Sequence, residues 1–159
     1  MCIRRSVLTV FVVTCILASS ALYEHLRLID SEPDELAFQN AAAIWYEAAR
    51  TKNLHMMTAL YTRTARLLPF TAPVAVGKEN VRLAWDDLMS NPGFAVVIGN
   101  DLTEIAVSDD LRYYINTLEV SLRDSEDRVV TCQGKHIMVW KMQPNGEWKA
   151  SVDVFNVSL

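Results

Sequence analysis

The chain has 159 residues, of which 51% are hydrophobic and 21% are charged. This length fits one domain with its own core, and this composition excludes an intrinsically disordered chain. The formal net charge of −4 at pH 7 argues against a nucleic-acid-binding protein, because such proteins hold phosphates mainly with basic side chains.

The first 21 residues predict a secretory signal peptide. Arg4 and Arg5 precede any acidic residue, and an uncharged apolar stretch follows from residue 7 to residue 17. The small residues 18–21 then offer a cleavage site. This order of a basic start, a short apolar stretch and small residues is typical of exported proteins.

Two alternatives to a cleaved signal are open. The apolar stretch could be retained as an anchor, although it is short for a membrane span. Cys15 could carry a lipid, although the FVVT before it is a poor match to the Leu and small residues of a lipoprotein signal. We expect cleavage before Ala21 or Leu22 and export, with residues 22–33 as a connector and residues 34–159 as one domain.

Cleavage would leave a more acidic chain with one thiol. It removes Arg4 and Arg5 but no acid, which leaves 13 basic and 19 acidic residues and a formal net charge of −6. That charge disfavours nucleic acid as a partner, and it disfavours binding to an anionic membrane surface after cleavage. Cys132 would then be alone, so no intrachain disulfide is expected.

Three helices are predicted in the first half of the domain. The SEPD sequence at residues 31–34 is typical of a helix start, and apolar residues recur at steps of three and four as far as about Lys52. A second helix is expected over residues 54–61 and a third over residues 78–89. Residues 66–77, which contain two prolines, are expected to form short extended pieces.

Four strand-like segments follow Gly93, with turn signals between them. The segments are FAVVIGNDLTEIAV, LRYYINTLEVSLR, RVVTCQGKHIMVWKM and EWKASVDVFNV. The turns SDD, DSED and QPNG separate them. Helices followed by strands predict an α+β domain whose helices cover one face of an antiparallel sheet.

Three stretches of this sequence resemble the nuclear transport factor 2-like superfamily, in particular its SnoaL-like and ketosteroid-isomerase-like branch. They are AIWYEAARTKNLHMMTALYTRTARLLPF, VGKENVRLAWDDLM and GKHIMVWKMQPNGEWKASVDVFN, and their order carries the resemblance from about Asp34 to Asn156. The resemblance implies a cone-shaped α+β fold, with three N-terminal helices packed on a curved, mostly antiparallel sheet and a pocket at the open end. It implies a homodimer as well. It leaves the activity open, because this fold hosts isomerases, cyclases, dehydratases, hydrolases and association modules.

The resemblance also implies which residues line the pocket. The position of the oxyanion-stabilising Tyr of steroid isomerases falls at Trp45, that of their general-base Asp at Leu68, and that of their protonated Asp at His136. Two further wall positions fall at Asp153 and Phe155. Because Leu68 cannot accept a proton, steroid isomerisation by the family's route is not expected.

The last hairpin raises the question of why two polar residues lie among apolar ones. If QPNG is a four-residue turn, His136 faces Asp153 directly; if the turn has two residues, His136 faces Phe155 and Asp153 is one diagonal away. In both registers the pair shares a face with Met138 and Trp140. An odd-numbered loop or a bulge would separate the pair.

Two roles are open for His136 and Asp153. They are candidate catalytic residues, because such a pair can serve as acid and base near neutral pH. They are equally candidates for a satisfied structural pair that ties the last two strands together. We expect no metal, because His25 and His55 show no ligand spacing, and no cofactor, because no phosphate-binding loop is present.

Tyr113 and Tyr114 are adjacent in a strand, so only one of them should face the pocket. A simple DSED turn puts Tyr113 on the face of His136, and a bulge would reverse this. The expected pocket-lining residues are Trp45, Leu68, Tyr113, Met138, Trp140 and Phe155.

Two functions from different classes follow. The first is an exported domain that binds a small apolar organic molecule, with cofactor-free isomerisation, dehydration or cyclisation as its chemistry if it has any. The second is a non-catalytic association or accessory domain that dimerises or docks a partner through its outer sheet face, where Val129, Ile137 and Val139 lie opposite His136. A pocket that exposes His136 and Asp153 would favour the first function, and a pocket filled by aromatic and Met side chains the second.

Overall fold

The computed structural model describes residues 35–158 except residues 71 and 109. The predicted signal peptide and connector therefore lie outside the described residues. The residues from Gln39 to Leu159 form one compact unit, and the fold below is the fold of that unit. Within the described part of the chain, no helix combines the length and the apolar character that a membrane crossing needs.

Three helical segments pack apolar faces against the sheet. The helix that spans residues 35–50 buries Ala41, Trp45 and Ala48, which recur at steps of three and four. The short helix α2 (Leu54–Ala59) begins at Asn53, whose side chain accepts a hydrogen bond from the backbone N–H of Met56.

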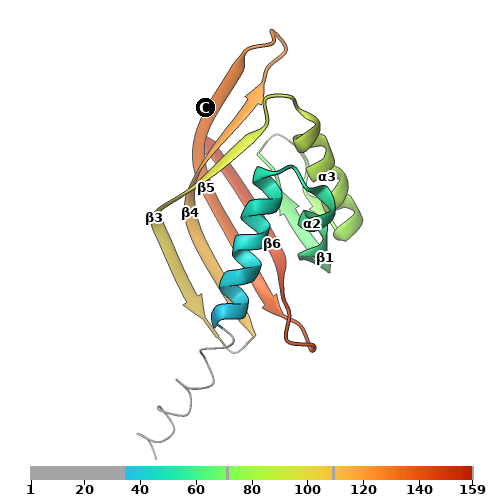
Figure 1. Ribbon diagram of the computed structural model, residues 1–159, viewed down its shortest axis with the longest axis vertical. Coiled ribbons are helices and arrows are strands. Elements are labelled where there is room, and N and C mark those ends of the chain that lie inside the picture. The colour runs from blue at the N-terminus through green and yellow to red at the C-terminus, as the bar shows by residue number, and fades with distance from the viewer. Residues whose placement is uncertain (1–34, 71, 109, 159) are drawn as a thin grey trace, which may run out of the picture. The chain divides into compact units, whose positions relative to one another are not determined.

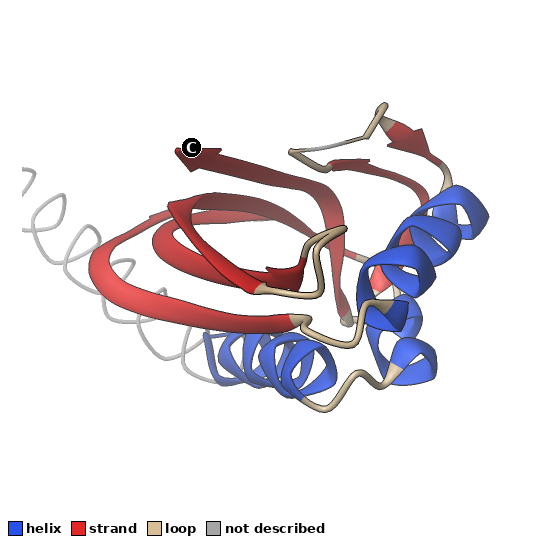
Figure 2. Ribbon diagram, turned by 90° about the horizontal axis from the view of Figure 1, so that it is seen from above, coloured by secondary structure: helices blue, strands red, loops and turns tan. Residues whose placement is uncertain are grey.

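Helix α3 (Lys78–Ser90) matches the third predicted helix within one residue. It begins after Gly77, whose φ of 85° is a conformation that glycine adopts without strain. Its buried face consists of Val81, Trp85 and Met89. Figures 1 and 2 both show the helices on one face of the sheet, which we call the inner face; the opposite face is the outer face.

Between the second and third helices, where only short extended pieces over residues 66–77 were expected, the structure has two strands, and the first of them begins five residues earlier, at Tyr61. Strand β1 (Tyr61–Leu68) follows α2 directly, and the short β2 (Ala75–Val76) pairs with it. The second helix therefore ends before Tyr61. Alternating burial within β1, where Ala65 and Leu67 are buried and Arg66 is exposed, is the period of a strand.

The sheet has six strands in the order β2-β1-β6-β5-β4-β3. The last four strands are β3 (Ala95–Val107), β4 (Leu111–Arg123), β5 (Val129–Met142) and β6 (Trp148–Ser158), all close to the predicted segments. Neighbouring strands are antiparallel except β1 and β6, which are parallel. The fold is thus α+β with a curved, open, mixed sheet (Figure 2).

The β4–β5 and β5–β6 hairpins have odd-numbered loops, whereas the registers predicted for them assumed even-numbered loops. Between β5 and β6, Met142 pairs with Trp148 across a five-residue loop. A bulge at Ser151 then shifts the register by one residue, so that His136 pairs with Phe155. Either irregularity alone would have put His136 and Asp153 on opposite faces, and together they cancel.

The loop between β4 and β5 also has five residues, because Arg123 pairs with Val129 and Asp127 adopts a positive φ of 64°. This register pairs Tyr113 with Val139 on the outer face. The prediction that Tyr113 lines the pocket was therefore wrong, and Tyr114 is the tyrosine on the inner face.

Candidate functional site

His136 and Asp153 meet on the inner face of the sheet. His136 Nε2 lies 2.8 Å from Asp153 Oδ1, across the diagonal between β5 and β6. Both side chains are 0% exposed. The bulge at Ser151 brings them together, so the contact depends on a backbone feature that the sequence pattern did not reveal.

Tyr61 is a third member of the cluster, and the sequence analysis missed it. Its O–H donates a hydrogen bond to Asp153 Oδ2. Its oxygen accepts hydrogen bonds from the indole N–H of Trp45 at 3.0 Å and from that of Trp85 at 2.9 Å. A phenol oxygen has one proton and two lone pairs, so this hydroxyl uses its full hydrogen-bonding capacity.

Asp153 therefore has a partner on each carboxylate oxygen. We call the five residues of this hydrogen-bonded group the Asp153 network, and they are Trp45, Tyr61, Trp85, His136 and Asp153. The network joins the first helix, α3 and strands β1, β5 and β6. A buried carboxylate is tolerated only when its oxygens are satisfied in this way.

The phenol of Tyr61 keeps its proton because of its surroundings. Burial raises the pKa of Tyr61 well above its ordinary value, and the negative charge of Asp153 raises it further. Burial and, to a lesser extent, Asp153 also raise the pKa of Tyr114. Both tyrosines therefore act only as neutral groups.

Aromatic rings enclose the imidazole of His136. The Phe155 ring is stacked on it at 4.7 Å between centroids, and the Trp45 ring at 4.9 Å. Tyr114 meets it edge-on at 5.7 Å. Among the described residues, His136 Nδ1 has no hydrogen-bond partner. The imidazole thus has one hydrogen bond among the described residues, to Asp153, while its direct cross-strand neighbour on β4 is the buried Asn116.

Among the side chains that the structure describes, the region predicted to be a pocket is filled. Trp45, Met138 and Trp140 are almost completely buried and belong to the core, so they do not line a cavity that is open to solvent. Beside Trp85, Phe94 and Phe155 there is about 10 Å³ of free space, which is about the minimum that a single buried water needs. His136 and Asp153 therefore face protein atoms.

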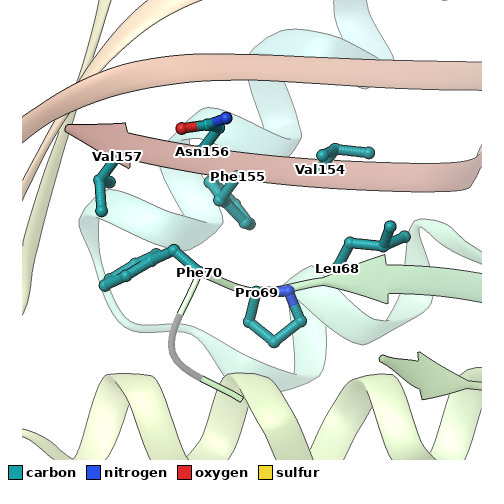
Figure 3. A pocket seen from close by; sticks show the side chains of 7 residues that line it. All are labelled: Leu68, Pro69, Phe70, Val154, Phe155, Asn156 and Val157. Atoms are coloured by element: carbon teal, nitrogen blue, oxygen red, sulfur yellow. The ribbon is translucent and has the colours of Figure 1, made fainter. Parts of the chain in front are cut away.

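A cleft of about 430 Å³ lies next to this core, between the end of β1 and the last residues of β6. Figure 3 shows Leu68 and Phe155 extending from the two strands toward the space between them. The residues that line the cleft are Leu68, Pro69, Phe70, Val154, Phe155, Asn156 and Val157. Of the predicted pocket-lining residues, Leu68 and Phe155 are in this set.

The cleft exists because β1 ends earlier than β6. The pairing of β1 with β6 ends at Leu68 and Val154. The next residue of the chain, Pro69, has no backbone N–H and cannot continue the ladder of hydrogen bonds. Strand β6 continues to Ser158 and pairs there with β5 alone. Among the described residues, the side of β6 that faces β1 thus lacks a strand partner beyond Val154.

Within the described residues, no group of three His, Cys, Asp or Glu side chains is arranged to hold a metal ion. Besides the Asp153 network, the buried polar residues of the described part of the chain include Arg112, Asn116, Thr58 and the hydroxyl-bearing Tyr114. Cys132 lies half-buried on β5, and its thiol is free.

Comparison with known proteins identifies the fold. No protein-family model and no curated protein matches the sequence. A candidate calcium/calmodulin dependent protein kinase II association domain from Xanthomonas campestris has a TM-score of 0.61 and 19% identity, over 72% of this chain and 80% of that chain. A ketosteroid isomerase-like protein from Erwinia carotovora atroseptica has a TM-score of 0.65 and 17% identity, over 76% and 93%. An NTF2-like protein with a cystatin-like fold from Novosphingobium aromaticivorans has a TM-score of 0.64 and 16% identity, over 87% and 88%. The chain thus has the nuclear transport factor 2-like fold, as its sequence predicted.

Replacing Tyr61 by Phe should destabilise the protein strongly. The substitution removes one donor to Asp153 and the common acceptor of Trp45 and Trp85, which leaves buried polar groups without partners. We expect the free energy of unfolding to fall by about 2–4 kcal/mol, measured by urea denaturation. The control is Tyr46→Phe, on a half-buried tyrosine outside the network, with an expected change within about 0.5 kcal/mol. Equal small changes in the two variants would contradict the assignment.

The same variant has a pH signature. An unfolded tyrosine ionises near pH 10, whereas the raised pKa of Tyr61 keeps it protonated in the folded state. This difference in pKa between the folded and the unfolded state contributes fully to the free energy of unfolding below about pH 10. The contribution is lost as the pH rises further. Tyr61→Phe should therefore show a shallower loss of stability above about pH 10 than the parent protein.

Proposed function

We propose that this chain is a binding domain that takes a small apolar organic molecule in the cleft beside β6, and that the buried pair of His136 and Asp153 is structural. The observation that carries the proposal is the contrast between two places. The titratable pair is fully buried and has protein partners, whereas the cleft is open and apolar.

The position of Phe155 supports a structural role for the pair. A general acid or base must come within hydrogen-bond reach of the proton that it transfers, about 3 Å. Phe155 lines the cleft and is stacked on the imidazole of His136. A molecule in the cleft therefore meets the phenyl ring before it meets the imidazole.

The steroid-isomerase chemistry of this fold lacks its base in this chain. Leu68, which the family resemblance puts at the position of that base, lines the cleft with a side chain that cannot accept a proton. Trp45, at the position of the oxyanion-stabilising tyrosine, donates its indole N–H to Tyr61. Both substitutions favour binding over isomerisation.

The size and lining of the cleft indicate the class of ligand. About 430 Å³ lies within the range of small-molecule sites, which is about 300–1,000 Å³. The lining side chains are apolar apart from Asn156. This supports a small apolar ligand with few hydrogen-bonding groups and gives no reason to invoke a cofactor.

A second candidate function is association through the outer face of the sheet, which the burial of Trp45, Met138 and Trp140 in the expected pocket region supports. Val97, Val129 and Ile137 lie on this face and are 52%, 57% and 37% exposed. Exposed apolar side chains on one face of a sheet support a protein interface there, although Gln133 and Lys135 are exposed on the same face. One structural neighbour is described as a candidate association domain.

Export is part of the proposal. The basic start and short apolar stretch within residues 1–21 support a cleaved signal and a mature chain that begins at Ala21 or Leu22. Sequencing the N-terminus of the exported protein tests this, and an intact Met1 in the soluble cytosolic fraction would contradict it.

His136→Ala should lower stability, because it leaves a buried carboxylate with one partner fewer. Breaking a buried pair costs about 3–5 kcal/mol, and Asp153→Ala in the same background should recover part of that loss. Thermal and urea denaturation measure both effects. His55→Ala, on an exposed histidine of α2, is the matched control and should change little. An unchanged stability of His136→Ala would argue for a catalytic role instead.

The cleft should bind a neutral apolar probe. We expect saturable fluorescence enhancement of N-phenyl-1-naphthylamine, and we expect Asn156→Trp, which fills the cleft from an exposed position, to weaken binding by at least about tenfold, or about 1.4 kcal/mol. Thr131→Trp, at an exposed position of β5 away from the cleft, should bind as the parent protein does. Equal binding by both variants would place the probe elsewhere and refute the cleft as the site.

The outer face should hold two copies together. Light scattering at micromolar concentration should give twice the mass of one chain, which is 17.9 kDa before cleavage. Ile137→Asp should produce monomers, because a charge opposite another copy would be buried without a partner. Leu83→Asp, at a 50% exposed position of α3, should remain dimeric. A monomeric parent protein would rule out this interface.

A further inference from the structure

We infer that the ligand of the cleft is an apolar carboxylate, whose acid group is held at the rim by Arg66 of β1 and Lys135 of β5. The inference rests on the proposed function and adds the chemical class of the ligand. It is carried by the position of two cations that flank an apolar cleft.

Strand register places both cations beside the lining residues. Arg66 precedes Leu68 by two positions, so the two side chains share one face of β1 at a spacing of about 7 Å. Lys135 is the direct cross-strand partner of Asn156, and the two Cβ atoms of such a pair lie about 5 Å apart. Leu68 and Asn156 both line the cleft, so a cation stands at each side of it.

Neither cation is neutralised by a carboxylate of the described residues. Arg66 and Lys135 are exposed and take part in none of the ion pairs there. The register neighbours of Arg66 on the adjacent strands are Val76 and Val152. The acid nearest to Lys135 by register is Glu119, one diagonal away, and its carboxylate accepts a hydrogen bond from Gln133 instead.

Four other arginines of the described residues are paired with carboxylates. Arg50, Arg82, Arg123 and Arg128 each lie within 4 Å of a carboxylate that is close in sequence. The whole chain has a net charge of −4, so acidic groups are in excess. Two unneutralised cations around an apolar cleft, in an acidic protein, favour an anionic ligand over a neutral or cationic one.

The backbone at the cleft provides donors as well. Beyond Val154, β6 has no partner on the side of β1 among the described residues, and Pro69 cannot fill that place in the ladder. N–H groups on this edge are free to donate to a carboxylate oxygen, and the apolar part of the ligand would lie against Leu68, Phe70 and Phe155. A phosphate ester would match the charge, but the small number of donors and the apolar lining fit a carboxylate better.

The test compares sodium octanoate with 1-octanol, which has the same chain length and no charge. Titration calorimetry of the exported protein at low salt should show that octanoate binds tighter than octanol. Each exposed ion pair contributes up to about fivefold in affinity, so the two cations together should give a preference of about 5- to 25-fold. At 0.5 M NaCl the preference should fall to within about twofold, because exposed charges are screened.

The double variant Arg66→Gln/Lys135→Gln should lose the preference for octanoate while keeping its affinity for octanol. The matched control is Arg63→Gln/Lys141→Gln, which removes one arginine of β1 and one exposed lysine of β5 that do not line the cleft. It should keep the preference of the parent protein. An equal loss in the control would overturn the assignment to Arg66 and Lys135, because it would reflect net charge alone.

The failures of the two proposals can be told apart. Octanol binding without any preference for octanoate would overturn the carboxylate inference and leave the cleft as an apolar site. Absence of binding by either probe would overturn both the inference and the proposed function.

Discussion

The arrangement of the core depends on one buried carboxylate. Asp153 is removed from water, and such a group destabilises a fold unless both of its oxygens find partners. His136 supplies one partner and Tyr61 the other, and the Tyr61 oxygen in turn accepts from Trp45 and Trp85. Because these residues come from three strands and two helices, satisfying one side chain fixes how the helices lie on the sheet. Each side chain of the network satisfies a buried polar atom of another, so the network constrains the fold as a unit.

The same network accounts for where the accessible site lies. Tyr61 must be in β1 and Asp153 in β6 for their side chains to meet, and this requires the parallel pairing of these two strands. The pairing ends at Leu68, where Pro69 follows, while β6 continues along β5. The end of β1 therefore leaves a gap against β6 at the point where the indole and phenyl rings have filled the interior. The polar groups are inside the core, and the apolar cleft is outside it.

Much of the fold could be predicted from the sequence, because its signals are local. Period-two patterns and turn residues gave the last four strands, and the apolar face of α3 with Gly77 before it gave that helix. The first part of β1 was missed because the apolar residues before Tyr61 continue a helical spacing, and only the partner β6, far away in sequence, selects the strand. The loop lengths and the bulge at Ser151 were missed because one residue more or less leaves no mark on an alternating pattern. For this reason Tyr113 was placed on the wrong face.

The candidate site shows why a titratable pair is a weak guide to catalysis when it is found from sequence. His136 and Asp153 in an apolar strand pattern fit a catalytic pair and a satisfied structural pair equally well. Burial distinguishes them, because a carboxylate and an imidazole that are 0% exposed are out of reach of a substrate. That burial depends here on tertiary packing, including the packing of Tyr61, whose strand the local pattern hid. For charged residues at the rim of the cleft, the sequence hides a role instead of suggesting one. Arg66 and Lys135 look like ordinary exposed cations in the sequence. Only the register of β1, β6 and β5 brings them to one cleft. In both cases tertiary pairing, more than residue type, decides which polar groups are available to a ligand.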